Sequence, residues 1–181
     1  MTRIPRQLAK NKITSLNLKN KKKTKDDLNA ENYLKIVKEK IGFIPNVLAA
    51  FSNFPKQFEG FTKLYNSIML GDSGLTKLER EMIAVTVSSL NHCFYCIVAH
   101  GSAVRELSED PQLGERLISN LEATNLAKKH QVMLRYVKEL TKNPSNINQK
   151  FLQNRISSIG TVGRTEIFPL PLNGDWYTQT N

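Results

Sequence analysis

Two cysteines and a histidine have a spacing that suits thiol chemistry. Cys93, Cys96 and His100 follow one another at intervals of three and four residues, and residues with these separations share a face of a helix. At about 100° per residue, all three lie within roughly 60° of one another around the helix axis. A thiolate is the reactive form of cysteine, and an imidazole within hydrogen-bond reach can take the thiol proton. The pattern predicts a dithiol site in which Cys96, one turn before His100, is the better candidate for activation.

Glu81 is expected to join this site from the preceding helix. If the chain turns near Asn91 into an antiparallel helical hairpin, Glu81 lies ten residues before the turn and His100 nine residues after it. At about 1.5 Å of rise per residue, both stand roughly 14–15 Å from the turn. A carboxylate at that level can orient the imidazole or relay its proton. A partner at that level would also explain a charge that borders the apolar run at residues 82–85.

Helical periodicity runs through most of the chain and predicts an all-α fold of seven to eight helices. Apolar residues recur at three and four in the segments around 33–41, 55–69, 76–90, 96–107, 113–121, 132–140 and, more weakly, 151–156. Thr76 and Glu79 have the spacing of a capping box at the start of the third of these long segments. Arg80 is expected to face solvent. His130, beside two lysines, is expected to be an ordinary surface residue.

Basic residues are concentrated at the N-terminus. Residues 1–25 hold nine Lys or Arg and no acid, so the rest of the chain has 17 basic and 16 acidic residues within a net charge of +10. This composition predicts either a disordered tail or an anion-binding or targeting arm, with nucleic acid the less favoured partner. We expect a tail at 1–26, a helical domain at 27–160 and an irregular segment at 161–181.

Neither a secretory signal nor a membrane span is predicted. The N-terminal 25 residues have no apolar core of the length that a signal peptide needs. No stretch of about 18 apolar residues occurs anywhere in the chain. The expected location is the cytoplasm, or the mitochondrion if the basic N-terminus is a transit peptide.

The cysteines have other possible roles. They can be small apolar residues in a core, or Cys93, Cys96 and His100 can bind zinc together with a carboxylate. Structural zinc usually takes two paired ligand clusters, and no second cluster is present. Haem attachment needs a histidine directly after the second cysteine, where this chain has Ile97. A non-catalytic helical module that binds metal or a partner therefore stands as the alternative to a redox enzyme.

The site motif resembles that of the AhpD-like alkylhydroperoxidases of the carboxymuconolactone decarboxylase superfamily, in particular the peroxidase-related branch. The residues that carry this resemblance are Leu75-Thr76-x-x-Glu79-Arg80-Glu81-x-x-Ala84 and Asn91-x-Cys93-x-Tyr95-Cys96-x-x-x-His100. Gly42-Phe43-Ile44-Pro45-Asn46 and Met133-Leu134-x-Tyr136-x-x-x-Leu140-Thr141 extend the likeness over roughly residues 30–160. Tyr95 stands where the best-studied alkylhydroperoxidases have a second histidine.

The resemblance implies a helical homo-oligomer, a trimer or hexamer, that reduces hydroperoxides. By analogy Cys96 attacks the peroxide and becomes a sulfenic acid, Cys93 resolves it to a disulfide, His100 is the base and Glu81 completes a proton relay. A dithiol reductant, lipoylated or thioredoxin-like, restores the thiols, and neither a cofactor nor a metal is expected. Decarboxylation on the same scaffold is less attractive, since relatives with that activity do not depend on this cysteine pair.

Overall fold

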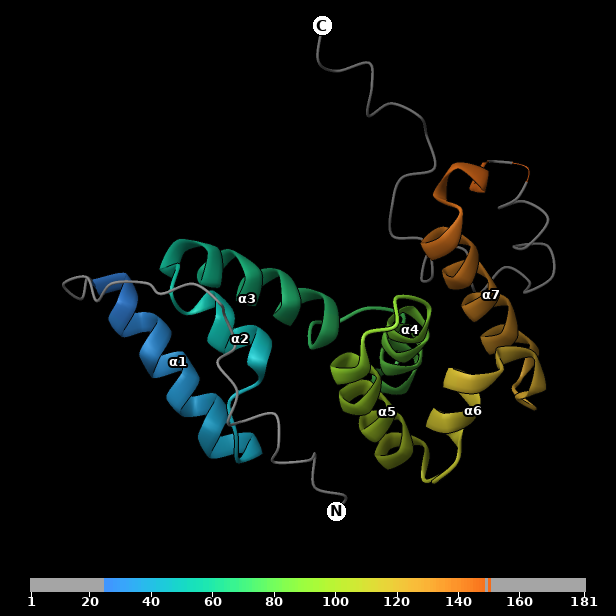
Figure 1. Cartoon of the computed structure of the whole chain (residues 1–181), viewed down its shortest axis with the longest axis horizontal. Helices are drawn as coiled ribbons and strands as arrows, with labels where there is room; N and C mark the ends of the chain where they lie inside the picture. Colours follow the sequence, from blue (N-terminus) through green and yellow to red (C-terminus); the bar gives the residue numbers. More distant parts are fainter. Residues whose placement is uncertain (1–24, 149, 151–181) are drawn as a thin grey trace, which may run out of the picture. The chain divides into compact units, whose positions relative to one another are not determined.

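The computed structural model describes residues 25–148 and 150. Their regular structure consists of seven α-helices and two short 3₁₀ helices, and no strand occurs in this part of the chain, which confirms the all-α prediction. The chain divides into two compact units between Gly71 and Asp72 (Figure 1). The basic tail, the weak helix around 151–156 and the C-terminal segment lie outside the described residues. The domain boundaries therefore stay predictions.

The first unit consists of α1 (Lys25–Ile41), α2 (Asn46–Phe51) and α3 (Pro55–Met69). Gly42 ends α1 with a φ of 83°, and its amide donates to the carbonyl of Lys38 at 2.8 Å. Glycine adopts this left-handed conformation without steric cost, which is why it follows so many helices. Pro55 opens α3, where a fixed φ is an advantage and no amide hydrogen is needed.

The core of the first unit is small and aromatic. Ala30, Leu48 and Phe58 are buried together. Tyr33 packs edge-on against Phe58, with ring centroids 5.5 Å apart, and its hydroxyl donates to the side-chain oxygen of Asn66 at 3.2 Å. These contacts tie α1 to α3.

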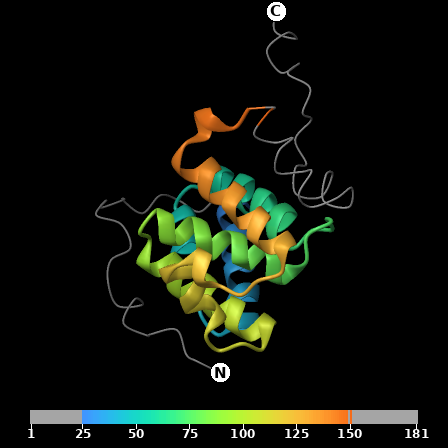
Figure 2. The same cartoon turned by 90° about the vertical axis from the view of Figure 1, so that its right-hand side faces the viewer.

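The second unit consists of α4 (Lys77–Leu90), α5 (Phe94–Ser108), α6 (Leu113–Ser119) and α7 (Lys128–Lys142), with 3₁₀ helices at Leu121–Ala123 and Pro144–Asn146. α4 contacts each of the other three α-helices, and α5 also contacts α6. Figure 2 shows these helices from a second direction, with α7 in orange. Because α4 has helical neighbours on several sides, it is the central element of the unit.

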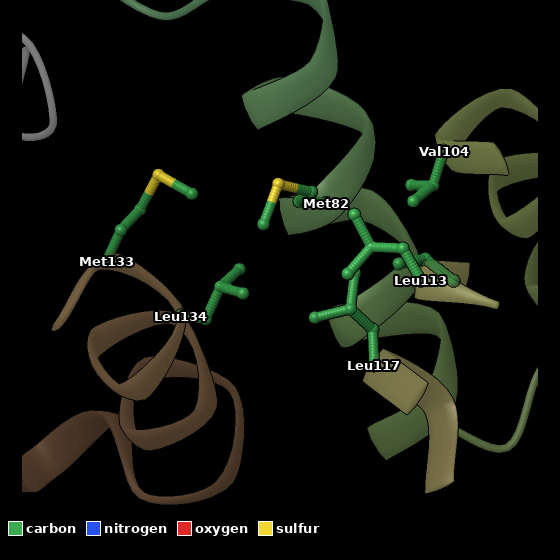
Figure 3. Packing of buried hydrophobic residues seen from close by; sticks show 7 residues of the cluster. Met82, Val104, Leu113, Leu117, Met133 and Leu134 are labelled. Atoms are coloured by element: carbon green, nitrogen blue, oxygen red, sulfur yellow. The ribbon is translucent and has the colours of Figure 1, made fainter. Parts of the chain in front are cut away.

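The core of the second unit surrounds α4. Met82 is fully buried and lies between Met133 and Leu134 of α7 on one side and residues of α5 and α6 on the other (Figure 3). Val85, Val104, Leu113 and Leu117 complete the buried cluster. This packing fixes the position of α4 within the unit, and α4 forms a hairpin with α5.

The hairpin begins and turns where the sequence predicts. The hydroxyl of Thr76 accepts from the amide of Glu79 at 3.2 Å, and the Glu79 carboxylate accepts from the amide of Thr76 at 2.8 Å, so the capping box is confirmed. α4 ends at Leu90, and Asn91 and His92 form the turn. The amide of Cys93 donates to the carbonyl of Ser88 at 3.0 Å, which closes the turn.

A close approach of two backbones joins α5 to α6. A Cβ placed on Gly114 would meet the carbonyl oxygen of Gly101 at 2.8 Å. Because that oxygen belongs to the backbone of α5, we expect Gly114→Ala to lower the free energy of unfolding by about 1–3 kcal/mol, measured by urea denaturation. Gly60→Ala is the control: a Cβ there meets nothing within 4 Å, so alanine should be neutral or stabilising in that helix. Equal stability of Gly114→Ala and the unaltered chain would contradict the close packing.

Candidate active site

Glu81 and His100 are hydrogen-bonded to each other across the hairpin. Oε2 of Glu81 on α4 lies 2.7 Å from Nδ1 of His100 on α5, and the two side chains are 18% and 25% exposed. The two residues are therefore level, as their distances from the turn predict. At this exposure the carboxylate is partly shielded from water, and this shielding strengthens its hydrogen bond with the imidazole.

This contact determines which nitrogen of His100 is available. A carboxylate can only accept hydrogen bonds, so Nδ1 of His100 is the donor. In the neutral imidazole the second nitrogen, Nε2, then keeps its lone pair and can accept a proton. A carboxylate in this position would stabilise an imidazolium if Nε2 took a proton. The pair is thus arranged as a base with its orienting carboxylate.

The two cysteines occupy different positions at the start of α5. Cys93 is the N-cap residue, with φ −83° and ψ 91°, and Cys96 is the third residue of the helix. The expectation that both lie on one helix is therefore wrong for Cys93, which precedes it. Both cysteines are free thiols and half-buried. Cys93 makes no capping hydrogen bond through its side chain, so its sulfur is not needed to begin the helix.

The thiol of Cys96 is protonated at neutral pH. Burial, followed by a hydrogen bond and charge interaction with Cys93, raises the pKa of Cys96 to about 11, although its own backbone amide at the helix start acts in the opposite direction. The partial positive charge of a helix N-terminus favours a thiolate, and burial outweighs that effect here. A base is consequently required if Cys96 is to become a nucleophile near neutral pH.

Alkylation of Cys96 is expected to report this raised pKa. The rate with iodoacetamide, followed by mass spectrometry of the peptide that contains the cysteines, should rise about tenfold per pH unit between pH 8 and 10, because the thiolate fraction does so below the pKa. An ordinary cysteine levels off above about pH 8.5. In Cys93→Ser the levelling-off should move to lower pH, since one of the raising influences is gone. If the alkylation rate of Cys96 in the unaltered protein has already reached its plateau at pH 7, the cysteine is an activated thiolate and the raised pKa is refuted.

A second charged cluster joins the start of α4 to the start of α7, and no pattern in the sequence predicts it. The buried carboxylate of Glu79 lies 3.0 Å from Nζ of Lys129 and 3.0 Å from Nε2 of His130, besides capping Thr76. The expectation that His130 is an ordinary surface residue is therefore wrong. Glu79 and His130 are 51 residues apart in the sequence, and no local pattern predicts a contact over that separation.

The cluster keeps Glu79 ionised. Burial is the largest single influence on its pKa and opposes the charge. The hydrogen bonds from the Thr76 amide, Lys129, the Thr76 hydroxyl and His130 together outweigh it and lower the pKa to about 2. Glu79 therefore has two roles, as a capping residue and as the anion that anchors α7.

Arg80 also differs from expectation. It was predicted to face solvent, but it is buried at 8% exposure, and its Nη2 donates to the hydroxyl of Ser73 at 2.9 Å. The guanidinium thereby holds the segment that leads into α4. Arginine can place its long stem along apolar surface while its polar end finds a partner, which explains how a charged residue fits here.

The described residues offer no arrangement for zinc. Within residues 25–148 and 150, no three side chains of His, Cys, Asp or Glu are grouped so as to hold a metal ion. Nδ1 of His100, one of the atoms that a zinc site could use, is bound to Glu81. No helix in the same part of the chain is long and apolar enough to cross a membrane.

Comparisons with known proteins identify the family. Residues 55–139 match the model of the Carboxymuconolactone decarboxylase family. A crystal structure of an uncharacterized peroxidase-related protein from Silicibacter sp. TM1040 is 42% identical, with a TM-score of 0.74, over 83% of this chain and 78% of that chain. An uncharacterized peroxidase-related protein from Ralstonia eutropha JMP134, described as an alkylhydroperoxidase AhpD core, is 30% identical, with a TM-score of 0.69, over 74% of this chain and 70% of that one. The chain belongs to the AhpD-like carboxymuconolactone decarboxylase superfamily.

Membership of the AhpD-like superfamily confirms the resemblance found in the sequence. Glu81, both cysteines and His100 all lie within the segment that matches the family model. A comparison with curated proteins found no match. Membership of the superfamily shows the fold, and the reaction depends on the residues of this chain.

Proposed function

We propose that this protein is a thiol-dependent peroxidase that reduces organic hydroperoxides through Cys93 and Cys96. The observation that carries the proposal is the 2.7 Å contact between Glu81 and Nδ1 of His100, one helical turn beyond Cys96. A buried thiol with a raised pKa needs a nearby base, and this contact leaves Nε2 of His100 free to be one. The peroxidase-related names of the two similar structures agree with this chemistry.

The reaction begins at Cys96. Nε2 of His100 takes the thiol proton, and the thiolate attacks the terminal oxygen of the hydroperoxide, the one that carries the hydrogen. The O–O bond breaks, the alkoxide takes the proton from the imidazolium of His100 and leaves as an alcohol, and Cys96 becomes a sulfenic acid. Two electrons pass from sulfur to the peroxide. Glu81 stabilises the imidazolium between the two proton transfers.

The reaction ends with a disulfide. The sulfur of Cys93 attacks the sulfenic sulfur of Cys96, the S–O bond breaks, and the hydroxyl group leaves as water. A dithiol reductant, which we expect to be lipoylated or thioredoxin-like, then exchanges with the disulfide and returns both thiols. We further expect a trimeric or hexameric assembly in the cytoplasm, to be tested by light scattering of the purified protein and by cell fractionation.

The test of the proposal is a thiol titration before and after one equivalent of cumene hydroperoxide, followed by mass spectrometry of the peptide with Cys93 and Cys96. Rapid loss of two thiols with a mass decrease of two hydrogens supports it. Thiols that stay unreactive across pH 7–9 would overturn it and favour a non-catalytic module on the same fold. Thiols that become titratable only after chelation would point to a metal-binding module.

Glu81→Gln should separate the charge of Glu81 from its shape. Glutamine can still accept a hydrogen bond from Nδ1 of His100, but it cannot stabilise the imidazolium. We expect the rate of the first oxidation to fall about 100-fold, measured by stopped flow, with the fold retained. Glu106→Gln removes the same charge from an exposed position on α5 and should leave the rate unchanged. Equal rates in the two variants would exclude a proton relay through Glu81.

A further inference from the structure

One face of α3 exposes a stripe of apolar side chains. Leu64 and Ile68 are 60% and 58% exposed, and the N-cap residue Phe54 and Tyr65 are 44% and 39% exposed. At about 100° per residue, these four positions lie within roughly 100° of one another around the helix axis. Phe58, which is buried in the core of the first unit, lies beside this arc and not within it. The four residues, called the α3 stripe below, are therefore a second apolar face of the helix.

The charged side chains of α3 lie on the opposite side of the helix. Lys56, Glu59 and Lys63 fall within an arc of about 60°, whose centre is roughly 160° from the centre of the stripe. Nζ of Lys63 lies 2.6 Å from Oε1 of Glu59, and both side chains are exposed. A surface without charge is matched by a partner surface without charge, because an unpaired charge is costly to bury. The charged side of α3 thus suits solvent, and the stripe suits an apolar partner.

The size of the α3 stripe fits the apolar part of one side of a protein interface. A large side chain that is fully exposed has about 200 Å² of accessible surface, so the exposed parts of the four side chains amount to about 400 Å². A standard interface buries about 800 Å² per partner, of which somewhat more than half, about 450 Å², is apolar. Apolar patches of a few hundred Å² on a protein surface often mark an interaction site.

The first unit is itself the best match for the stripe among the described parts of the chain. Eleven large hydrophobic side chains of the first unit are at least 36% exposed, whereas in the described residues of the second unit only Phe94, Leu107 and Leu140 are. Phe94 and Leu107 are 13 positions apart on α5, which corresponds to about 20 Å along the helix, so they do not form one patch. An apolar surface of matching size is therefore offered by the first unit of another copy.

We propose that the α3 stripe is a contact between copies of this chain, in which it packs against the first unit of a second copy. The two first units bring apolar surface to the contact, and the charges of α3 stay in solvent. The contact supplies one interface of the oligomeric assembly expected above. It does not depend on the reaction at Cys96, so its failure and the failure of the peroxidase function are separate results.

The test compares Ile68→Asp with Ser67→Asp in the full chain, by sedimentation velocity over about a hundredfold range of protein concentration. Ser67 is exposed and lies about 100° from Ile68, beside the charged side of α3. Both substitutions place the same charge in the last turn of the helix, and isoleucine and serine have similar helix propensities. We expect Ile68→Asp to raise the dissociation constant of the assembly about 100-fold or more, because an unpaired charge is buried in the contact. Ser67→Asp should change it less than about threefold.

Cross-linking locates the partner surface. In a Cys93→Ser, Cys96→Ser background, Leu64→Cys introduces the only cysteine of the chain. A short bismaleimide should then link two copies through their stripes in much higher yield than it links chains with Ser67→Cys in the same background. This measurement needs no substitution by a charged residue, so it remains informative if Ile68→Asp fails to fold.

Three results would overturn the inference. The first is a protein that is monomeric at every concentration, or one in which the two aspartate substitutions affect the assembly equally. The second is a lower melting temperature of Ile68→Asp with unchanged sedimentation, which would show that the stripe is covered within its own chain. The third is equal cross-linking at positions 64 and 67. None of these bears on the loss of thiols with cumene hydroperoxide, which tests the function.

Discussion

Replacing Cys96 by serine is expected to abolish hydroperoxide consumption, with a loss on the order of 10³-fold or more. The serine hydroxyl is a far weaker acid than a thiol, and the pair of Glu81 and His100 cannot turn it into a comparable nucleophile. Cys93→Ser should behave differently, since it keeps the attacking sulfur. We expect it to consume one equivalent of peroxide per chain and then stop, because the sulfenic acid has no partner.

The two serine variants are to be compared by the amount of cumene hydroperoxide consumed per chain and by its initial rate of loss, without added reductant. Their thermal unfolding provides the control for the fold. Serine at position 93 is a strong N-cap residue, so this variant should be no less stable than the unaltered chain. Undiminished peroxide loss in Cys96→Ser would refute the assignment of Cys96 as the attacking residue.

Replacing Glu79 by glutamine is expected to destabilise the second unit substantially. Lowering the pKa of this carboxyl from 4.5 to about 2 corresponds to about 3 kcal/mol of free energy of unfolding at neutral pH. The carboxylate is 4% exposed, so its charge is shielded from water. Because it binds Lys129 and His130, these two side chains lose their anionic partner in the variant. Urea denaturation at pH 7 measures the difference.

The pH dependence gives an independent check on Glu79. Its folded-state pKa is lowered, so the stabilisation is fully present above about pH 4.5 and is lost as the pH falls toward 2. The difference between Glu79→Gln and the unaltered protein should therefore shrink across that interval. Glu122→Gln removes an exposed partner of Arg135 and should cost at most about 1 kcal/mol. A Glu79→Gln protein no less stable than this control would contradict the anchoring role of the cluster.

Features that depend on neighbours in sequence could be predicted, and contacts between distant segments could not. The capping box of Thr76 and Glu79 and the glycine after α1 follow from preferences within a few residues. The level of Glu81 with His100 follows from counting residues on either side of a turn. By contrast, the contact of Glu79 with His130 depends on how α7 packs against α4, which no short pattern encodes.

The site illustrates the same limit on a finer scale. The identity of its residues came from spacing, but their ionisation did not. Counting residues placed Cys96 near the start of a helix, a position that lowers the pKa of a thiol. The burial of Cys96 depends on the packing of the whole unit, and it raises the pKa by more than the helix start lowers it. The backbone conformation of His92 was also invisible, because glycine rather than histidine is the usual signal for a left-handed residue.

The hairpin keeps all four proposed catalytic residues within one short stretch of chain. Glu81 and His100 are separated by only 19 positions, and both cysteines lie between them. Contacts at so small a separation form early in folding, on the timescale of helix growth and local loop closure, before distant segments have met. The reactive geometry is therefore close to a portable module: residues 76–108, grafted onto a helical host that supplies neighbours for Met82 and Val85, would bring their own turn, capping box and Glu81–His100 hydrogen bond with them.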